Sequence, residues 1–138
     1  MRGHRARPKF YYVLSFVVPA AVMAIAFAAL GITPFGDMSL AISDGDALYI
    51  NYMGYVSGVL RGEQDVLFSL TKGLGGNMAG TWGWFLGNPL FALFALFDVT
   101  DYMRVYTLVV TLCLSAYGPA AYALLRELYG DGLPNVAL

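Results

Sequence analysis

The fold of this chain is decided by an uninterrupted apolar run, Phe10–Leu30, which reads "FYYVLSFVVPAAVMAIAFAAL". The run contains no side chain that carries a charge near neutral pH. An α-helix of this length rises about 31 Å, which is enough to cross a hydrocarbon core of about 30 Å. A secretory signal peptide would have an apolar part of only about 7 to 15 residues, followed by a small-residue cleavage motif. Because "ITPFG" follows here instead, the run predicts a transmembrane helix.

A second apolar run, Val105–Leu125, lies near the other end of the chain and is closed by Arg126 and Glu127. Of the 138 residues, 59% are hydrophobic and only 12% are charged, where a soluble domain carries about 25% charged residues. Both runs contain a proline, which membrane helices tolerate and which often kinks them. We therefore expect an all-α membrane protein with two transmembrane helices, over residues 10–30 and 102–125.

The distribution of charge predicts the orientation. Arginine and lysine crowd residues 1–9, whereas the connection 31–101 contains only Arg61 and Lys72 against seven acidic residues. Cytoplasmic flanks collect basic residues, so 1–9 and 126–138 are predicted to be cytoplasmic tails and 31–101 an extracytoplasmic loop. The net charge of −1 gives no indication of nucleic-acid binding. The single cysteine, Cys113, excludes a disulfide within the chain.

The extracytoplasmic loop is too long to lack structure, because structureless loops above about 15 residues are uncommon. Apolar residues recur at helical spacing near 43–61, with Ser43 as the expected N-cap and Arg61 followed by glycine at the other end. Asn88 and a following proline predict the start of a second short helix near 88–97. We expect the first helix to lie at the membrane interface and the second, which is too short to span, to be interfacial or re-entrant.

Between these two helices, the stretch "SLTKGLGGNMAGTWGW" predicts a tight, irregular backbone beside an aromatic anchor, because it contains five glycines and two tryptophans. It is not a phosphate-binding P-loop, since Lys72 neither follows a glycine nor precedes a serine or threonine. The sequence contains no metal-binding motif such as paired cysteines or H-E-x-x-H.

Three aspartates, Asp37, Asp44 and Asp46, lie within ten positions of this otherwise charge-poor chain. Two explanations remain open for Asp44 and Asp46. They fall in the first turn of the predicted helix, where the helix dipole makes each acid favourable by about 0.3 to 1 kcal/mol. Alternatively, a carboxylate held at the outer membrane surface can deprotonate a substrate hydroxyl. Two carboxylates can also share a hard cation, which leaves a divalent cation open.

The chain resembles a known family over about residues 10–125. The stretches "PFGDMSLAISDGDALY", "LFSLTKGLGGNMAG" and "NPLFALFALF" occur in an order that resembles the beginning of YfhO-type bacterial membrane proteins. That family is similar to the GT-C glycosyltransferases, which take a sugar from a polyprenyl-phosphate carrier at the outer face of the membrane. The resemblance implies the amino-terminal part of a multi-pass enzyme of the bacterial cell membrane that glycosylates cell-envelope polymers. Such a part would be inactive without the remaining transmembrane helices.

The resemblance also implies roles for individual residues. Asp44 becomes the candidate general base, with Asp46 as second choice, and Asp37 either contacts substrate or orders the loop. Arg61 and Lys72, the only basic residues of the loop, would contact the carrier phosphate, or else serve as a helix-terminal charge and a solubilising residue.

Other functions remain open. One is a non-catalytic membrane scaffold that binds a partner and whose aspartates only cap a helix. A transporter is less favoured, because the two predicted spans contain no charge at mid-membrane.

Overall fold

The structure is a computed structural model that describes residues 8–130. The chain divides into two compact units, one formed by residues 1–31 with 110–138 and the other by residues 32–109. Most of the two predicted cytoplasmic tails, residues 1–7 and 131–138, lies outside the described residues.

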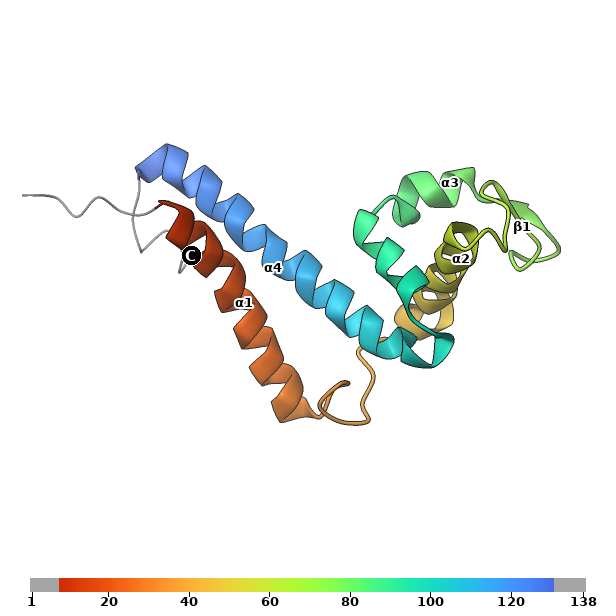
Figure 1. The fold of residues 1–138 in the computed structure, drawn as a ribbon, viewed down its shortest axis with the longest axis horizontal. Coiled ribbons are helices and arrows are strands. Elements are labelled where there is room, and N and C mark those ends of the chain that lie inside the picture. The colour runs from red at the N-terminus through yellow and green to blue at the C-terminus, as the bar shows by residue number, and fades with distance from the viewer. Residues whose placement is uncertain (1–7, 131–138) are drawn as a thin grey trace, which may run out of the picture. The chain divides into compact units, whose positions relative to one another are not determined.

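The first unit consists of two long helices, α1 (Pro8–Leu30) and the greater part of α4 (Tyr102–Tyr129), which lie side by side in Figure 1. Both helices are long and apolar enough to cross a membrane. The prediction of two candidate membrane-spanning helices in a mostly helical protein is therefore confirmed. Both helices continue through their internal prolines, Pro19 and Pro119.

The second long helix runs further than its apolar run. It ends at Tyr129, where Gly130 adopts the left-handed conformation (φ +83°) and its N–H donates to the carbonyl of Arg126 at 2.8 Å. A glycine in this conformation is a common helix terminator. Residues 126–129, predicted as the start of a tail, are therefore helical.

Beyond Lys9, the exposed side chains of α1 are apolar, unlike those of a helix on the surface of a soluble protein. Large exposed hydrophobic residues occur along almost its whole length, namely Phe10, Val13, Val17, Val18, Val22, Ile25 and Leu30. A helix that is apolar on its exposed side as well as its packed side suits a lipid environment.

Close packing between α1 and α4 is centred on Gly118. A Cβ atom at this position would collide with the backbone carbonyl oxygen of Ser15. One turn further along α4, the fully buried Tyr122 packs against Tyr11 and Tyr12, with ring centroids 6.0 and 4.9 Å away. Small residues allow this approach of two helix backbones, as is common between membrane helices.

The second unit is built around α2 (Ile50–Leu60), which continues directly from a turn of π-helix, η1 (Gly45–Tyr49). This helix packs on η3 (Pro89–Leu96), a 3₁₀-helix. The contact buries Met53 and Val56 of α2 and Phe94 of η3. Phe94 also meets the first residue of α4, Tyr102, edge to face with ring centroids 5.2 Å apart. The residues that enter the second candidate span are thus part of this core.

Two local predictions need correction. Ser43 is not the N-cap, because it has a positive φ of 54° and its carbonyl, not its side chain, accepts the bond from the N–H of Ala47. Asp44 occupies the cap position instead, without a side-chain capping bond. The short helix near 88–97 begins as predicted, with the Asn88 side chain accepting from the N–H of Leu90 at 3.0 Å, but it is 3₁₀ rather than α.

The glycine-rich stretch forms a small hairpin that the sequence reading did not predict. Strands β1 (Phe68–Ser69) and β2 (Gly76–Asn77) pair antiparallel, and the turn between them contains Gly73 (φ +65°). Three short helices complete the unit: α3 (Ala79–Thr81), a turn of π-helix η2 (Trp82–Leu86), and a 3₁₀ turn η4 (Val99–Asp101) before α4.

The close contact at Gly118 predicts a stability effect. Gly118→Ala should destabilise the chain by about 1 to 3 kcal/mol, because the added methyl forces the two backbones apart. The matched variant is Gly80→Ala, where a Cβ would meet nothing within 4 Å and where alanine favours the helix. Thermal unfolding of the purified chain in nanodiscs measures both, and equal midpoints for the two variants would contradict the assigned contact.

Candidate functional site

The acid-bearing segment 37–46 is fixed to the beginning of α4 by two contacts. The hydroxyl of Ser39 donates to the sulfur of Met103 at 3.4 Å. A Cβ atom on Gly45 would lie 3.6 Å from the hydroxyl of Tyr106. Since Met103 and Tyr106 lie in the first two turns of α4, the segment is held where the second candidate span begins.

Asp44 and Asp46 flank Gly45 and are exposed, whereas Gly45 itself is buried. Neither carboxylate has a hydrogen bond or ion pair within the described residues 8–130. Asp44 is at the N-cap position of η1 and Asp46 is in its first turn. Both carboxylates are therefore accessible to a ligand and stand at the positive end of a helical segment.

Asp37 lies in a turn that other residues hold together. The N–H of Thr33 donates to the carbonyl of Met38 at 2.8 Å, and the hydroxyl of Thr33 donates to the carbonyl of Gly36 at 3.0 Å. The Asp37 side chain is exposed. The order of this turn thus comes from Thr33, and the position of Asp37 leaves its carboxylate available for other contacts.

Arg61, one of the two predicted phosphate contacts, is engaged within the protein. Its Nε donates to the carbonyl of Ala95 at 3.2 Å and its Nη2 to the carbonyl of Phe97 at 2.6 Å. These carbonyls lie at the C-terminal end of η3, where helical backbones leave acceptors unsatisfied. The guanidinium therefore joins the end of α2 to the end of η3.

Lys72, the other predicted phosphate contact, extends from the hairpin turn toward two neutral oxygens. Its Nζ donates to the carbonyl of Asn77 at 3.0 Å and to the hydroxyl of Thr81 at 3.3 Å. No described carboxylate lies within ion-pair distance of it. Its positive charge is thus positioned by the fold but not neutralised by an acid.

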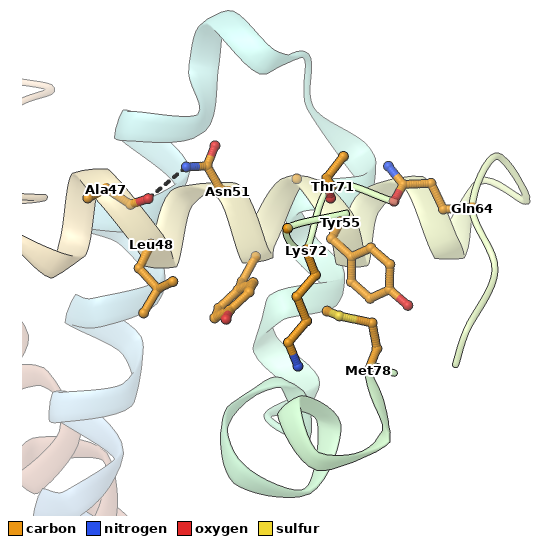
Figure 2. Close-up of a pocket in the computed structure, with 11 residues that line it drawn as sticks. Ala47, Leu48, Asn51, Tyr55, Gln64, Thr71, Lys72 and Met78 are labelled. Carbon is orange, nitrogen blue, oxygen red and sulfur yellow. Dashed lines mark hydrogen bonds between the residues drawn. The ribbon is translucent and has the colours of Figure 1, made fainter. Parts of the chain in front are cut away.

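The side chain of Lys72 lines a pocket of about 590 Å³, here called the hairpin pocket. The pocket lies between residues 47–55, which belong to η1 and α2, and residues 64–78, which include the hairpin. Figure 2 shows Lys72 and Met78 beside Tyr55 of α2. The sequence reading identified Lys72 but missed the polar residues that share this pocket, Asn51, Gln64 and Thr71. Asp37, Asp44 and Asp46 do not line it.

Tyr55 supports one wall of the hairpin pocket. It is 4% exposed, and its hydroxyl donates to the carbonyls of Asp65 and Val66 at 2.6 and 2.9 Å. The indole N–H of Trp82 donates to the same carbonyl of Val66 at 2.6 Å. Burial is the main cause that raises the pKa of Tyr55 above its ordinary value; the Trp82 side chain opposes this effect, and the Asp65 carboxylate adds to it.

Metal-binding geometry is limited in the described part of the chain. No group of three or more histidine, cysteine, aspartate or glutamate residues within 8–130 is arranged to hold a metal ion. The divalent cation left open for Asp44 and Asp46 therefore stays a prediction that would need ligands beyond these two carboxylates.

The fold and site together define a membrane protein in which an acid-bearing helical unit follows one candidate membrane-spanning helix along the chain and leads into the second. The sequence profile of the family described as bacterial membrane protein YfhO matches residues 15–132. Because the match covers most of the chain, this protein belongs to the YfhO family of bacterial membrane proteins. Searches of curated proteins and of solved structures found no match to the chain.

The bonds of Tyr55 predict a stability effect. Tyr55→Phe removes the donor of the Asp65 carbonyl, whereas the Val66 carbonyl keeps the indole N–H of Trp82. The loss should cost about 0.5 to 1.5 kcal/mol of unfolding free energy. Tyr129→Phe is the control, because Tyr129 is 75% exposed. Chemical denaturation at neutral pH measures both variants, and a loss no larger than that of the control would show that the Tyr55 hydroxyl does not hold the loop.

The raised pKa of Tyr55 predicts the pH dependence of that difference. The folded protein keeps the Tyr55 proton to higher pH than the unfolded chain, whose tyrosines titrate near 10. The stability that protonated Tyr55 contributes is therefore complete below about pH 10 and is lost as the pH rises above it. Repeating the denaturation across this range should show the wild type losing more stability than Tyr55→Phe. Parallel curves would contradict the raised pKa.

Proposed function

We propose that this protein is part of a membrane glycosyltransferase related to the GT-C enzymes, which transfers a sugar from a polyprenyl-phosphate carrier to a cell-envelope acceptor. One observation carries the proposal: two exposed carboxylates flank a glycine that packs on Tyr106 at the beginning of the second candidate span. Membership of the YfhO family supports it. With the loop on the outer side, as the charge distribution predicts, these acids lie where lipid-linked headgroups are found.

In the proposed reaction, Asp44 acts as the general base. Its carboxylate accepts the proton of the acceptor hydroxyl as that oxygen bonds to the anomeric carbon of the sugar. The bond between the anomeric carbon and the phosphate oxygen breaks, and its electron pair leaves with the polyprenyl phosphate. Asp46 is the second candidate for the same step. Asp37, exposed in the preceding turn, is a candidate for contacting the substrate.

The charge that develops on the phosphate leaving group needs a cation nearby. Of the two basic residues predicted for this role, Arg61 already bonds to two backbone carbonyls of the protein. Lys72 bonds to neutral oxygens and keeps its charge available. We therefore assign the phosphate contact to Lys72 and a structural role to Arg61. Transmembrane helices beyond this chain would supply the groove for the carrier's hydrocarbon chain.

A second candidate function is a non-catalytic scaffold whose acids only stabilise a helix. The position of Asp44 and Asp46 at the beginning of η1 favours it, because each acid is favourable there by about 0.3 to 1 kcal/mol. In this case the carboxylates contribute to stability and removing them has no effect on any transfer reaction.

The two functions separate in a transfer assay. Membranes expressing the full reading frame, as wild type or as Asp44→Asn, are supplied with radiolabelled polyprenyl-phosphate sugars, and transfer is measured at matched protein level. Loss of a general base should reduce transfer by about 10²- to 10⁴-fold. Asparagine keeps the shape of the side chain and remains a good N-cap residue.

The matched control is Asp98→Asn, an exposed acid at the cap of η4 in the same unit. It should leave transfer unchanged. If Asp44→Asn and Asp98→Asn transfer equally well, Asp44 is not the base, and an Asp46→Asn variant then decides between the second candidate residue and the scaffold.

A further inference from the structure

We propose that the hairpin pocket is a binding site for a phosphate-type oxyanion, with Lys72 as its cation. The pocket's volume of about 590 Å³ falls within the range of about 300 to 1,000 Å³ that is usual for small-molecule sites. All of its lining residues lie between 47 and 78, so the site is complete within the second unit. The inference deepens the proposed function and rests on it only for the identity of the natural ligand.

The charge of the hairpin pocket points to an anion. Lys72 is the one charged residue among those that line it, and no aspartate or glutamate is among them. Its ammonium group has three donors, and two of them bond to Asn77 and Thr81. These two bonds fix the position of the charge, and the third donor can bond to a ligand.

Two glycines shape the pocket around its polar side chains. A Cβ atom on Gly76 would lie 3.1 Å from Cδ of Lys72, so the lysine stem runs across the bare backbone of β2. A Cβ on Gly58 would lie 2.8 Å from Nε2 of Gln64. Glycine is the residue that allows such close approach. The position of the exposed Lys72 side chain is therefore shaped by its contact with Gly76 and by its two hydrogen bonds.

The remaining polar groups suit a phosphate ester of a hydroxyl-rich molecule. Lysine binds phosphate as a point charge, with donors that rotate to meet its oxygens. Nδ2 of Asn51 donates to the carbonyl of Ala47 at 2.8 Å, so this bond occupies one donor of the Asn51 amide (Figure 2). Gln64 and Thr71 offer further neutral donors and acceptors. Such a phosphate could belong to a soluble sugar phosphate or to a lipid headgroup.

Binding is measured by NMR on the chain in nanodiscs with ¹³C-methyl methionine. Met78 lines the hairpin pocket and reports on it, whereas Met23 lies in α1 outside this unit. Inorganic phosphate and glucose 1-phosphate should each shift the Met78 signal saturably and leave the Met23 signal unchanged. Glucose should shift neither signal.

Nanodiscs doped with phosphatidic acid test whether the phosphate comes from a lipid. If the doped lipid shifts the Met78 signal and weakens glucose 1-phosphate binding, the headgroup is the ligand. If it does neither, the soluble phosphate is.

Substitutions test the assigned residue. Lys72→Gln should weaken glucose 1-phosphate binding by about tenfold or more, because a charge-assisted hydrogen bond is lost. Arg104→Gln removes the same charge from a side chain that is 68% exposed and paired with Asp101, and it should leave binding unchanged. Gly76→Ala should weaken binding in the wild type but have no further effect when combined with Lys72→Gln.

A second variant guards against misfolding of Lys72→Gln. Asn51→Asp introduces a carboxylate into the hairpin pocket without altering the bonds of Lys72, and it should also weaken binding of the phosphate.

Two results would overturn the inference: the absence of any Met78 shift with either phosphate, or an equal loss of binding in Lys72→Gln and Arg104→Gln. Phosphate binding at Met78 together with unchanged transfer in both Asp44→Asn and Asp46→Asn of the full reading frame refutes the proposed function alone. Loss of transfer in Asp44→Asn without phosphate binding at Met78 refutes this inference alone.

Discussion

The second unit depends on the contact between α2 and η3. A loop that joins two membrane spans must bury its own apolar residues, and here Met53, Val56 and Phe94 do so. The contact also satisfies polar groups, because the Ser57 hydroxyl donates to the carbonyl of Phe94 at 3.2 Å and Arg61 donates to the carbonyls that follow. Once α2 is fixed, η1 and the hairpin pocket at its other side have defined positions.

Glycines determine where this protein can bring polar groups close to backbone. Gly58 accommodates Gln64, and Gly76 accommodates the stem of Lys72. Each of these approaches would need a shift or a tight contact if a Cβ were present. Two glycines of the loop thus have a specific structural explanation at the pocket, and Gly118 provides the equivalent between the two long helices.

The long elements could be predicted from the sequence because a single physical requirement, the thickness of the bilayer, determines their length. The start of η3 was also predictable, since an asparagine cap and a following proline act locally. The hairpin was not, because its strands are only two residues long and depend on glycine conformations that leave no periodic pattern. The hairpin pocket was missed for a similar reason: Asn51 and Gln64 are ordinary surface residues until α2 and the hairpin meet.

The acids and the lysine occupy different places in the same unit, and this separation has a chemical consequence. A carboxylate within hydrogen-bond reach of Lys72 would neutralise the lysine and lower its own basicity. Asp44 and Asp46 do not line the hairpin pocket, and Lys72 bonds only to neutral oxygens. A base that accepts a proton and a cation that holds a phosphate can therefore keep their charges in the absence of substrate. In the proposed transfer, two substrates would have to meet between these groups, with the phosphate of the donor at the lysine and the hydroxyl of the acceptor at the acid.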